Sequence, residues 1–210
     1  MSDSLQSPPN VASRGADAIR DSKRTEEVLD AARRLFYAKG YDATSVRDIA
    51  DDLGLLKGSL YYYFGAKEDL LYRLIEDIHV SLFDCVERAV RECDTPHAKM
   101  LAFIDQHTVF LANNIMDIAI FFNDFRKLTG ERRSSILAAR RRYEQILIEI
   151  IREGQDSGSF IAERDSTVAA LAILGLLNWT HQWYKEDGPL SAQMIAEEFA
   201  SLITFGLVKR

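Results

Sequence analysis

The stretch that decides the fold runs from residue 44 to residue 64 and reads TSVRDIADDLGLLKGSLYYYF. Its apolar residues between 46 and 53 recur three and four positions apart, as in a short helix with one buried face. Gly54 follows, and glycine readily adopts the left-handed conformation that ends a helix and reverses the chain. A second short helix is expected over 57–63. Two short helices joined by a tight glycine turn predict a helix-turn-helix.

The segments on either side support this prediction. Residues 24–39 carry a single apolar face and stop at Gly40, which is typical of a supporting helix. Either Thr44 or Ser45 can cap the helix that follows, because both have a hydroxyl that accepts a backbone hydrogen bond. A further helix is expected to begin at Lys67.

In a helix-turn-helix, the first residues of the second helix point into the major groove of DNA. We therefore expect Lys57, Gly58 and Ser59 to lie at the DNA, where lysine and serine can bond bases or phosphates and glycine allows a close backbone approach. Tyr61 and Tyr62 offer hydroxyl groups for phosphate or ring faces for a thymine methyl group.

Two cations flank this group. Arg47 is expected on the outer face of its helix, within reach of a base edge or the DNA backbone. Lys67, at the start of the next helix, can bind a phosphate together with the amides of that helix terminus. Thr44, just before the helix that contains Arg47, is a candidate phosphate contact or cap.

Taken together, residues 44–50, 53–55, 57–64 and 67–71 closely resemble the DNA-binding domain of tetracycline-repressor (TetR) family regulators. The resemblance covers residues 25–75. It implies an all-α homodimer in which a three-helix DNA-binding domain precedes a larger helical domain that binds a small molecule and releases DNA. The positions that match the DNA-contacting motif of the family are Ser45, Arg47, Lys57, Gly58, Ser59, Tyr61, Tyr62 and Lys67.

The overall charge of the chain argues against nucleic-acid binding at first sight. The net charge is −6 and the isoelectric point is near 5.3, whereas phosphate contacts favour a basic surface. Between residues 20 and 73, however, basic residues roughly offset the acidic ones, so most of the negative charge belongs to the rest of the chain. A small basic face can exist on an acidic protein.

The pattern downstream is helical almost throughout, so the sequence predicts an all-α fold of about nine helices. They are expected near residues 24–39, 46–53, 57–63, 67–92, 96–113, 117–128, 132–156, 165–184 and 191–207. We expect a disordered N-terminal tail over 1–21, the helix-turn-helix domain over 22–71, and a ligand-binding and dimerisation domain over 72–210.

Two aromatic segments with interspersed polar residues, 121–126 and 178–184, are the candidate walls of a ligand pocket. Aromatic residues at these positions can equally form the core or a dimer contact. A buried polar side chain needs a partner, which makes Arg126 and Asn178 informative if they face inward. The ligand-binding residues predicted on this basis are Phe122, Arg126, Asn178, Trp179 and Trp183.

Residues 121–205 also resemble, with looser motifs, the ligand domains of TetR-type repressors of fatty-acid and steroid degradation. The run Arg141-Arg142-Tyr143-Glu144 belongs to this resemblance, which adds Tyr143 to the predicted ligand-binding residues. That resemblance implies an acyl-CoA thioester as effector. Its phosphates need cations such as Arg126 or the run 140–142, although these arginines can also form a solvated helical face. A fourth helix over 67–92 can act as a lever between ligand and DNA domains.

The last two predicted helices are apolar over much of their surface and are expected to pair with those of a second chain, which also predicts a palindromic operator. An enzyme is disfavoured, since the four histidines and two cysteines have no metal-ligand spacing and no phosphate loop or nucleophile elbow occurs. We expect no catalytic residue, metal or cofactor, and a cytoplasmic location with reduced cysteines. A transcriptional activator or a ligand-independent DNA-binding protein remains the alternative.

Overall fold

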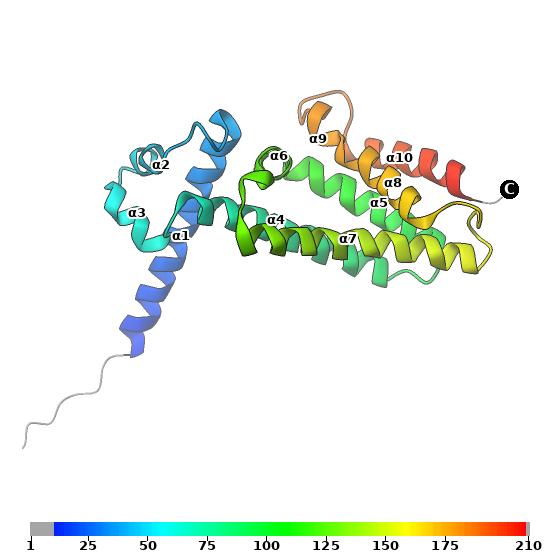
Figure 1. Ribbon diagram of the computed structural model, residues 1–210, viewed down its shortest axis with the longest axis horizontal. Helices are drawn as coiled ribbons and strands as arrows, with labels where there is room; N and C mark the ends of the chain where they lie inside the picture. The colour runs from blue at the N-terminus through cyan, green and yellow to red at the C-terminus, as the bar shows by residue number, and fades with distance from the viewer. Residues whose placement is uncertain (1–10, 209–210) are drawn as a thin grey trace, which may run out of the picture. The chain divides into compact units, whose positions relative to one another are not determined.

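The computed structural model describes residues 11–208, with side chains from residue 23 onward. Over these residues the chain forms ten α-helices and one short 3-10 helix (Figure 1). The predicted all-α class is confirmed. The chain divides into two compact units, the first ending at Leu70 and the second beginning at Leu71. This division lies one residue before the expected boundary.

The first unit contains α1 (Val11–Lys39), α2 (Val46–Asp52) and α3 (Lys57–Tyr63), with α2 packed against both others. Gly40 and Gly54 take φ angles of 83° and 62°, so glycine makes both chain reversals. The most deeply buried apolar residues of this unit are alanine, valine, isoleucine, leucine and phenylalanine. They are Val28, Ala31, Ala32, Phe36, Ile49, Ala50, Leu60 and Leu70.

The start of α1 corrects the predicted disordered tail. The tail was expected over 1–21, but residues 11–21 are helical, and residues 1–10 lie outside the described part of the chain. The prediction depended on missing apolar periodicity. Periodicity shows which face of a helix packs, whereas a helix already nucleated by its packed turns can extend into a segment that contains no proline.

The second unit is a bundle of longer helices. α4 (Lys67–Arg91) begins before the division and continues into this unit. It is followed by α5 (Pro96–Asn113), α6 (Ile115–Asp124), the 3-10 helix η1 (Phe125–Lys127) and α7 (Gly130–Asp156). α8 (Ser166–Asn178), α9 (Thr180–Trp183) and α10 (Ala192–Leu207) complete it. The single helix expected over 165–184 is therefore interrupted at Trp179.

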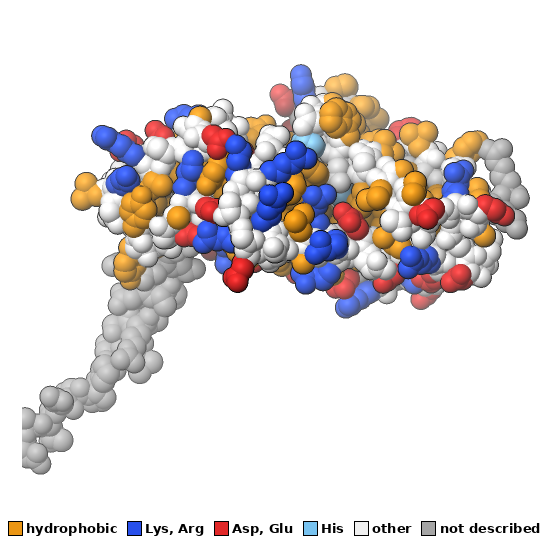
Figure 2. All heavy atoms as spheres, in the orientation of Figure 1, with side chains coloured by type: hydrophobic (Ala, Val, Ile, Leu, Met, Phe, Trp, Pro, Cys, Tyr) orange, Lys and Arg blue, Asp and Glu red, His pale blue; other side chains and the backbone are white. Residues whose placement is uncertain are grey.

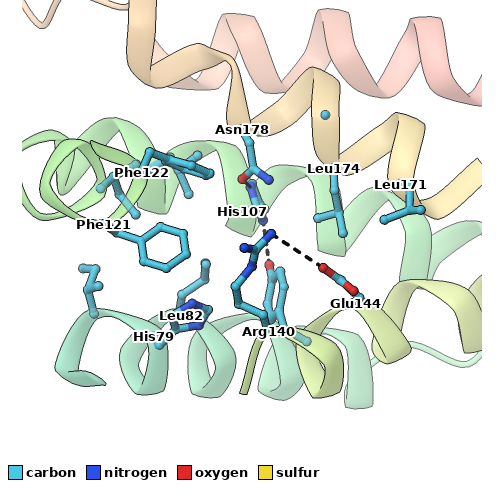
Figure 3. A pocket seen from close by; sticks show the side chains of 15 residues that line it. His79, Leu82, His107, Phe121, Phe122, Arg140, Glu144, Leu171, Leu174 and Asn178 are labelled. Carbon is cyan, nitrogen blue, oxygen red and sulfur yellow. Dashed lines mark hydrogen bonds and ion pairs between the residues drawn. The ribbon is translucent and has the colours of Figure 1, made fainter. Parts of the chain in front are cut away.

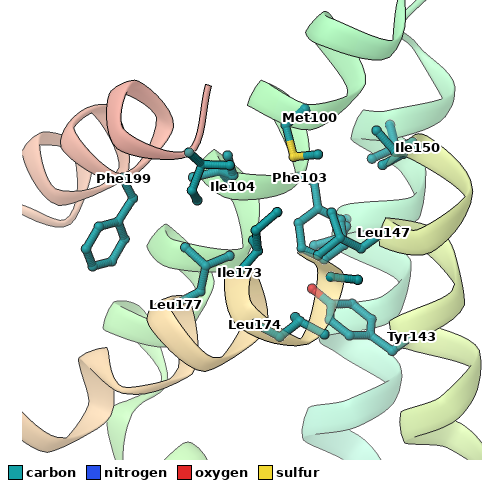
Figure 4. Close-up of a cluster of buried hydrophobic side chains, with 14 of the residues drawn as sticks. Met100, Phe103, Ile104, Tyr143, Leu147, Ile150, Ile173, Leu174, Leu177 and Phe199 are labelled. Carbon is teal, nitrogen blue, oxygen red and sulfur yellow. The ribbon is translucent and has the colours of Figure 1, made fainter. Parts of the chain in front are cut away.

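α5 occupies the centre of this unit, where it packs against α7, α8, α9 and α10. Its residues Met100, Phe103 and Ile104 are almost fully buried and meet side chains of α7 and α8 (Figure 4). This arrangement explains why α5 is apolar on several faces. The core that surrounds it holds the walls of the cavity described below.

A short connection ties the end of α7 to the end of α10. The amide of Phe160 donates to the carbonyl of Gly154 at 2.8 Å, and the amide of Ile161 donates to the carbonyl of Leu207 at 2.9 Å. Phe160 and Val208 form an isolated β-bridge. Among the described residues, no helix is long and apolar enough to cross a membrane.

Candidate DNA-binding surface and ligand cavity

The predicted DNA-contacting residues of α3 lie on an exposed surface. Leu60 is buried and anchors the helix, whereas Lys57, Gly58 and Ser59 are exposed. A Cβ placed on Gly58 would meet nothing within 4 Å, so the surface there can accept a close approach. Tyr61 and Tyr62 are also exposed, with Tyr62 at 76%. The structure therefore leaves all five residues available for a partner.

α2 is fixed at its start by a reciprocal cap. The Ser45 hydroxyl accepts from the amide of Asp48 at 3.1 Å, and the Asp48 carboxylate accepts from the amide of Ser45 at 2.7 Å. These bonds lower the pKa of Asp48 below its usual value. Arg47, on the same turn, has a side chain 80% exposed, and its Nε lies 3.6 Å from Asp51. Ser45 is thus the cap, and Arg47 projects outward as expected.

Thr44 does not fit its predicted role. Its side chain is 1% exposed, and its hydroxyl bonds the carbonyl oxygens of Gly40 at 2.9 Å and Leu35 at 3.2 Å. The hydroxyl closes the turn that follows α1. The prediction of Thr44 as a phosphate contact or cap is therefore wrong in this structure.

The Lys67 side chain is hydrogen-bonded to backbone carbonyls within the first unit. Its Nζ donates to the carbonyl of Tyr41 at 2.7 Å and to that of Thr44 at 2.8 Å, and it lies 4.0 Å from the centre of the Tyr41 ring. Two of the three ammonium protons are used in this way. Lys67 therefore holds the start of α4 to the turn between α1 and α2. The prediction that its ammonium group binds a DNA phosphate needs correction.

The second unit contains a cavity of about 220 Å³ with residues of α4, α5, α6, α7 and α8 in its walls. Most of its surface is apolar. The apolar lining comprises Ile78, Leu82, Leu111, Ile118, Phe121, Phe122, Leu171 and Leu174. The polar lining comprises His79, His107, Arg140, Tyr143, Glu144 and Asn178. An apolar site with a few convergent polar groups is the usual form of a small-molecule pocket.

Arg140 is the cation of this cavity and reaches into it from α7 (Figure 3). Its Nη2 lies 3.9 Å from Glu144, at the limit of an ion pair, and its guanidinium lies 5.8 Å and 5.3 Å from the rings of Phe121 and Phe125. A planar guanidinium held over aromatic rings can still offer N–H groups to an anion. Arg140 is therefore the residue of the cavity best suited to an anionic or strongly polar group.

A buried hydrogen-bond chain connects three helices behind Arg140. His107 Nδ1 lies 2.6 Å from the Tyr143 hydroxyl, and His107 Nε2 lies 3.1 Å from Asn178 Oδ1. Burial lowers the pKa of His107 to about 4 and raises that of Tyr143. The imidazole is consequently neutral, with its proton on Nε2 donated to Asn178 and its Nδ1 accepting from tyrosine. This chain fixes the Asn178 amide at the cavity wall.

Three of the six predicted ligand residues line the cavity, namely Phe122, Tyr143 and Asn178. The other three do not. Arg126 is exposed on η1, and Trp179 is 62% exposed. Trp183 is 42% exposed and lines a separate groove beside α10. The break between α8 and α9 turns both tryptophans away from the cavity wall that Asn178 occupies.

The prediction also missed the cavity residues on α4 and α5. His79 and His107 lie far from the aromatic segments in the sequence and belong to no motif. A weak signal was present, since each histidine interrupts an otherwise apolar helix face. Glu144 was not among the predicted ligand-binding residues, and Arg140 was only one of several candidate cations.

These two sites define a DNA-binding regulator with a separate ligand domain. Residues 28–74 match the bacterial regulatory proteins of the tetR family, and residues 93–207 match the tetracyclin repressor-like C-terminal domain. The chain belongs to the TetR family of transcriptional regulators. Its members are DNA-binding proteins and not enzymes, so the predicted absence of catalysis agrees with the family.

Three relatives align over most of the chain. The transcriptional repressor KstR2 of Mycolicibacterium smegmatis is 25% identical, covering 90% of this chain and 92% of its own. The structure of the ketosteroid transcriptional regulator KstR2 of Mycobacterium tuberculosis has a TM-score of 0.83 at 25% identity, covering 89% and 96% of the two chains. AibR, solved with isovaleryl coenzyme A and operator DNA, has a TM-score of 0.79 at 27% identity, covering 85% and 97%.

Proposed function

We propose that this regulator is a dimeric repressor that binds a palindromic operator and is released from it by a coenzyme A thioester of a small hydrophobic acid. The observation that carries the proposal is the mainly apolar cavity with Arg140 and the fixed Asn178 amide in its wall. The similarity to a repressor named KstR2 and to AibR bound to isovaleryl coenzyme A supports the effector class.

The cavity volume of about 220 Å³ suits a compact acyl group, and the coenzyme portion must extend beyond it. The Asn178 oxygen is occupied by His107, so its N–H groups remain to donate to a thioester carbonyl. Arg140 can bind a phosphate or carbonyl oxygen. Figure 2 shows Lys and Arg side chains gathered over the N-terminal half of α7, where phosphates of an extended ligand can be neutralised.

The dimer proposal follows from exposed apolar side chains on α8 and α10. On α8, Val168 is 65% exposed and Leu171 is 52% exposed. On α10, Leu202 and Phe205 are 63% and 73% exposed. Their helical spacing forms one stripe on each helix, and such a large exposed apolar surface is typical of an interface. A second copy that presents the same two helices covers both stripes in a four-helix contact.

Helix α4 contributes both to the cavity wall and to the unit that carries the predicted DNA-binding residues. Ile78, His79 and Leu82 of α4 line the cavity, and the same helix begins at Lys67, which is bonded to the turn before α2. A ligand that binds more tightly to one position of α4 can therefore change the distance between the two DNA-binding units of a dimer. An activator can use the same parts, with the opposite effect of ligand on DNA binding.

The test begins with an operator selected from a random duplex library. CoA thioesters of increasing acyl length are then titrated into the protein and DNA complex. We expect a thioester of a short or compact acid to release DNA and to raise the melting temperature with concentration. Arg140→Gln should weaken the thioester at least about tenfold, while Arg152→Gln, an exposed change near the C-terminal end of the same helix, should not. Free acids acting equally well would contradict the effector class.

The dimer is tested separately by light scattering after gel filtration. Leu202→Glu and Phe205→Glu place charges in the exposed stripe of α10 and should yield monomers that bind the operator weakly. Met116→Glu, at a residue 39% exposed on α6, is the matched control. A wild-type protein that is monomeric at micromolar concentration contradicts the dimer proposal.

A further inference from the structure

His79 on α4 presents a buried nitrogen without a partner. Its Nε2 is one of four buried side-chain nitrogen or oxygen atoms that lack a hydrogen-bond partner within the described residues; the others are threonine hydroxyls. Among these four side chains, His79 is the one that lines the cavity. A buried polar atom left unpaired is costly, so a partner is expected when the cavity is filled.

The orientation of the ring is fixed by its neighbours. The imidazole meets the Phe121 ring edge to face, with centroids 4.8 Å apart, and lies near Leu82 and Arg140 (Figure 3). A second hollow of about 270 Å³ between α4 and α7 also has His79 in its wall. The ring therefore stands between two spaces, and a hydrogen-bond partner for Nε2 can come from a ligand in the first.

The surroundings of the His79 ring favour a neutral hydrogen-bonding group of the ligand as its partner. Burial, together with the nearby positive charge of Arg140, lowers the pKa of His79 to about 4. A neutral imidazole can donate to a carbonyl oxygen or bond a hydroxyl group. An anionic group is better placed at Arg140. His79 projects from α4, whereas Asn178 projects from α8, so the two polar groups approach a ligand from different walls (Figure 3).

We propose that His79 is a specificity-determining residue that recognises a keto or hydroxyl oxygen on the hydrophobic body of the effector, separate from the group bound by Arg140 and Asn178. The effector then carries an oxygen atom on its hydrophobic body and is not the derivative of a plain hydrocarbon acid. This inference deepens the proposed function and uses the same cavity.

The experiment compares two fragments of one skeleton, indane and indanone, by calorimetric titration. Indanone adds a carbonyl oxygen, which is better hydrated in water, so the informative quantity is the ratio of the two dissociation constants and its change between variants. We expect His79→Phe, which keeps an aromatic ring against Phe121, to shift this ratio about tenfold against indanone. His79→Gln, which retains a hydrogen-bonding group, should restore part of the preference.

Leu82→Met is the matched control, since it changes the same wall without changing its polarity. It should alter both affinities together and leave the ratio within about twofold. An unchanged ratio in His79→Phe, or no detectable binding of indanone to the wild type, overturns the inference. If thioesters fail to release DNA while the ratio still depends on His79, the proposed effector class fails and the role of His79 stands.

Discussion

The hydroxyl of Tyr143 lies 2.6 Å from Nδ1 of His107, and both side chains are buried in the second unit. Replacing Tyr143 with phenylalanine removes the donor and leaves a buried imidazole nitrogen unpaired. We expect a loss of about 1–3 kcal/mol in the free energy of unfolding, measured by urea denaturation. Tyr37→Phe, at a residue 50% exposed on α1, should cost almost nothing. Equal stability of the two variants contradicts the importance of the bond.

The two buried histidines predict a loss of stability in acid. Burial lowers the pKa of both His79 and His107 to about 4. The unfolded chain protonates them near their ordinary pKa of about 6.5, so between pH 6.5 and 4 the unfolded state binds more protons than the folded state. Stability is therefore complete above about pH 6.5 and falls as the pH decreases, by up to about 3 kcal/mol for each histidine.

Urea denaturation between pH 7.5 and 5 measures this slope. The acidic limit of pH 5 avoids the separate loss expected when Asp48, whose pKa is lowered, becomes protonated. His79→Phe should reduce the slope, whereas Leu82→Met, a change in the same cavity wall that removes no titratable group, should leave it unchanged. An identical slope in the wild type and in His79→Phe is the result that contradicts the prediction.

The helix-turn-helix could be predicted from sequence because its determinants are local. Apolar spacing sets the buried faces of α2 and α3, and the two left-handed glycines set the turns. The roles of Thr44 and Lys67 could not be predicted in the same way. Each side chain bonds carbonyl oxygens of the turn after α1, and the direction of these carbonyls depends on the folded turn.

The cavity was only half predictable for a related reason. Aromatic content indicated Phe122 and the region of Asn178, and both residues line the cavity, but composition carries no information on where α8 ends. The helix stops at Asn178, so Trp179 and Trp183 turn outward. His107 lies 71 residues from its partner Asn178, and a contact of that separation leaves no periodic signal in a single sequence.

Any side chain at Gly154 is predicted to lower the stability of the protein because of the close contact with Phe160. A Cβ at this glycine would lie 2.1 Å from the Phe160 ring, which is itself 2% exposed. Gly154→Ala should therefore destabilise the protein by about 1–3 kcal/mol through overpacking. Phe160→Leu in the same chain should recover part of that loss, since the smaller side chain vacates the space. Additive losses in the double variant, measured by urea denaturation, contradict this explanation.

Substitution of Lys57 is predicted to affect DNA binding, whereas substitution of Lys67 is predicted to affect the stability of the fold. Lys67→Met removes the ammonium that donates to the carbonyls of Tyr41 and Thr44, of which the Tyr41 carbonyl keeps the Thr44 amide as a second donor. It should lower the free energy of unfolding by about 1–3 kcal/mol. Lys57→Met, at an exposed site on α3, should leave stability within about 0.5 kcal/mol but weaken DNA binding. Thermal unfolding and operator titration on both variants measure the two effects. A stable Lys67→Met protein contradicts the structural role.

Arg47 is predicted to contribute to DNA affinity without a structural role, since its side chain is 80% exposed and its ion pair with Asp51 is long, at 3.6 Å. If Arg47 binds a phosphate, Arg47→Ala should reduce the slope of log affinity against log salt by about one and weaken all DNA sequences equally. If it binds a base edge, the loss should be about 1–3 kcal/mol at one operator position, with little change in the salt slope. Asp51→Asn removes the ion pair and leaves Arg47 in place, so it serves as the control and should preserve or improve binding. Unchanged affinity and salt slope in Arg47→Ala would exclude Arg47 from the DNA-binding surface.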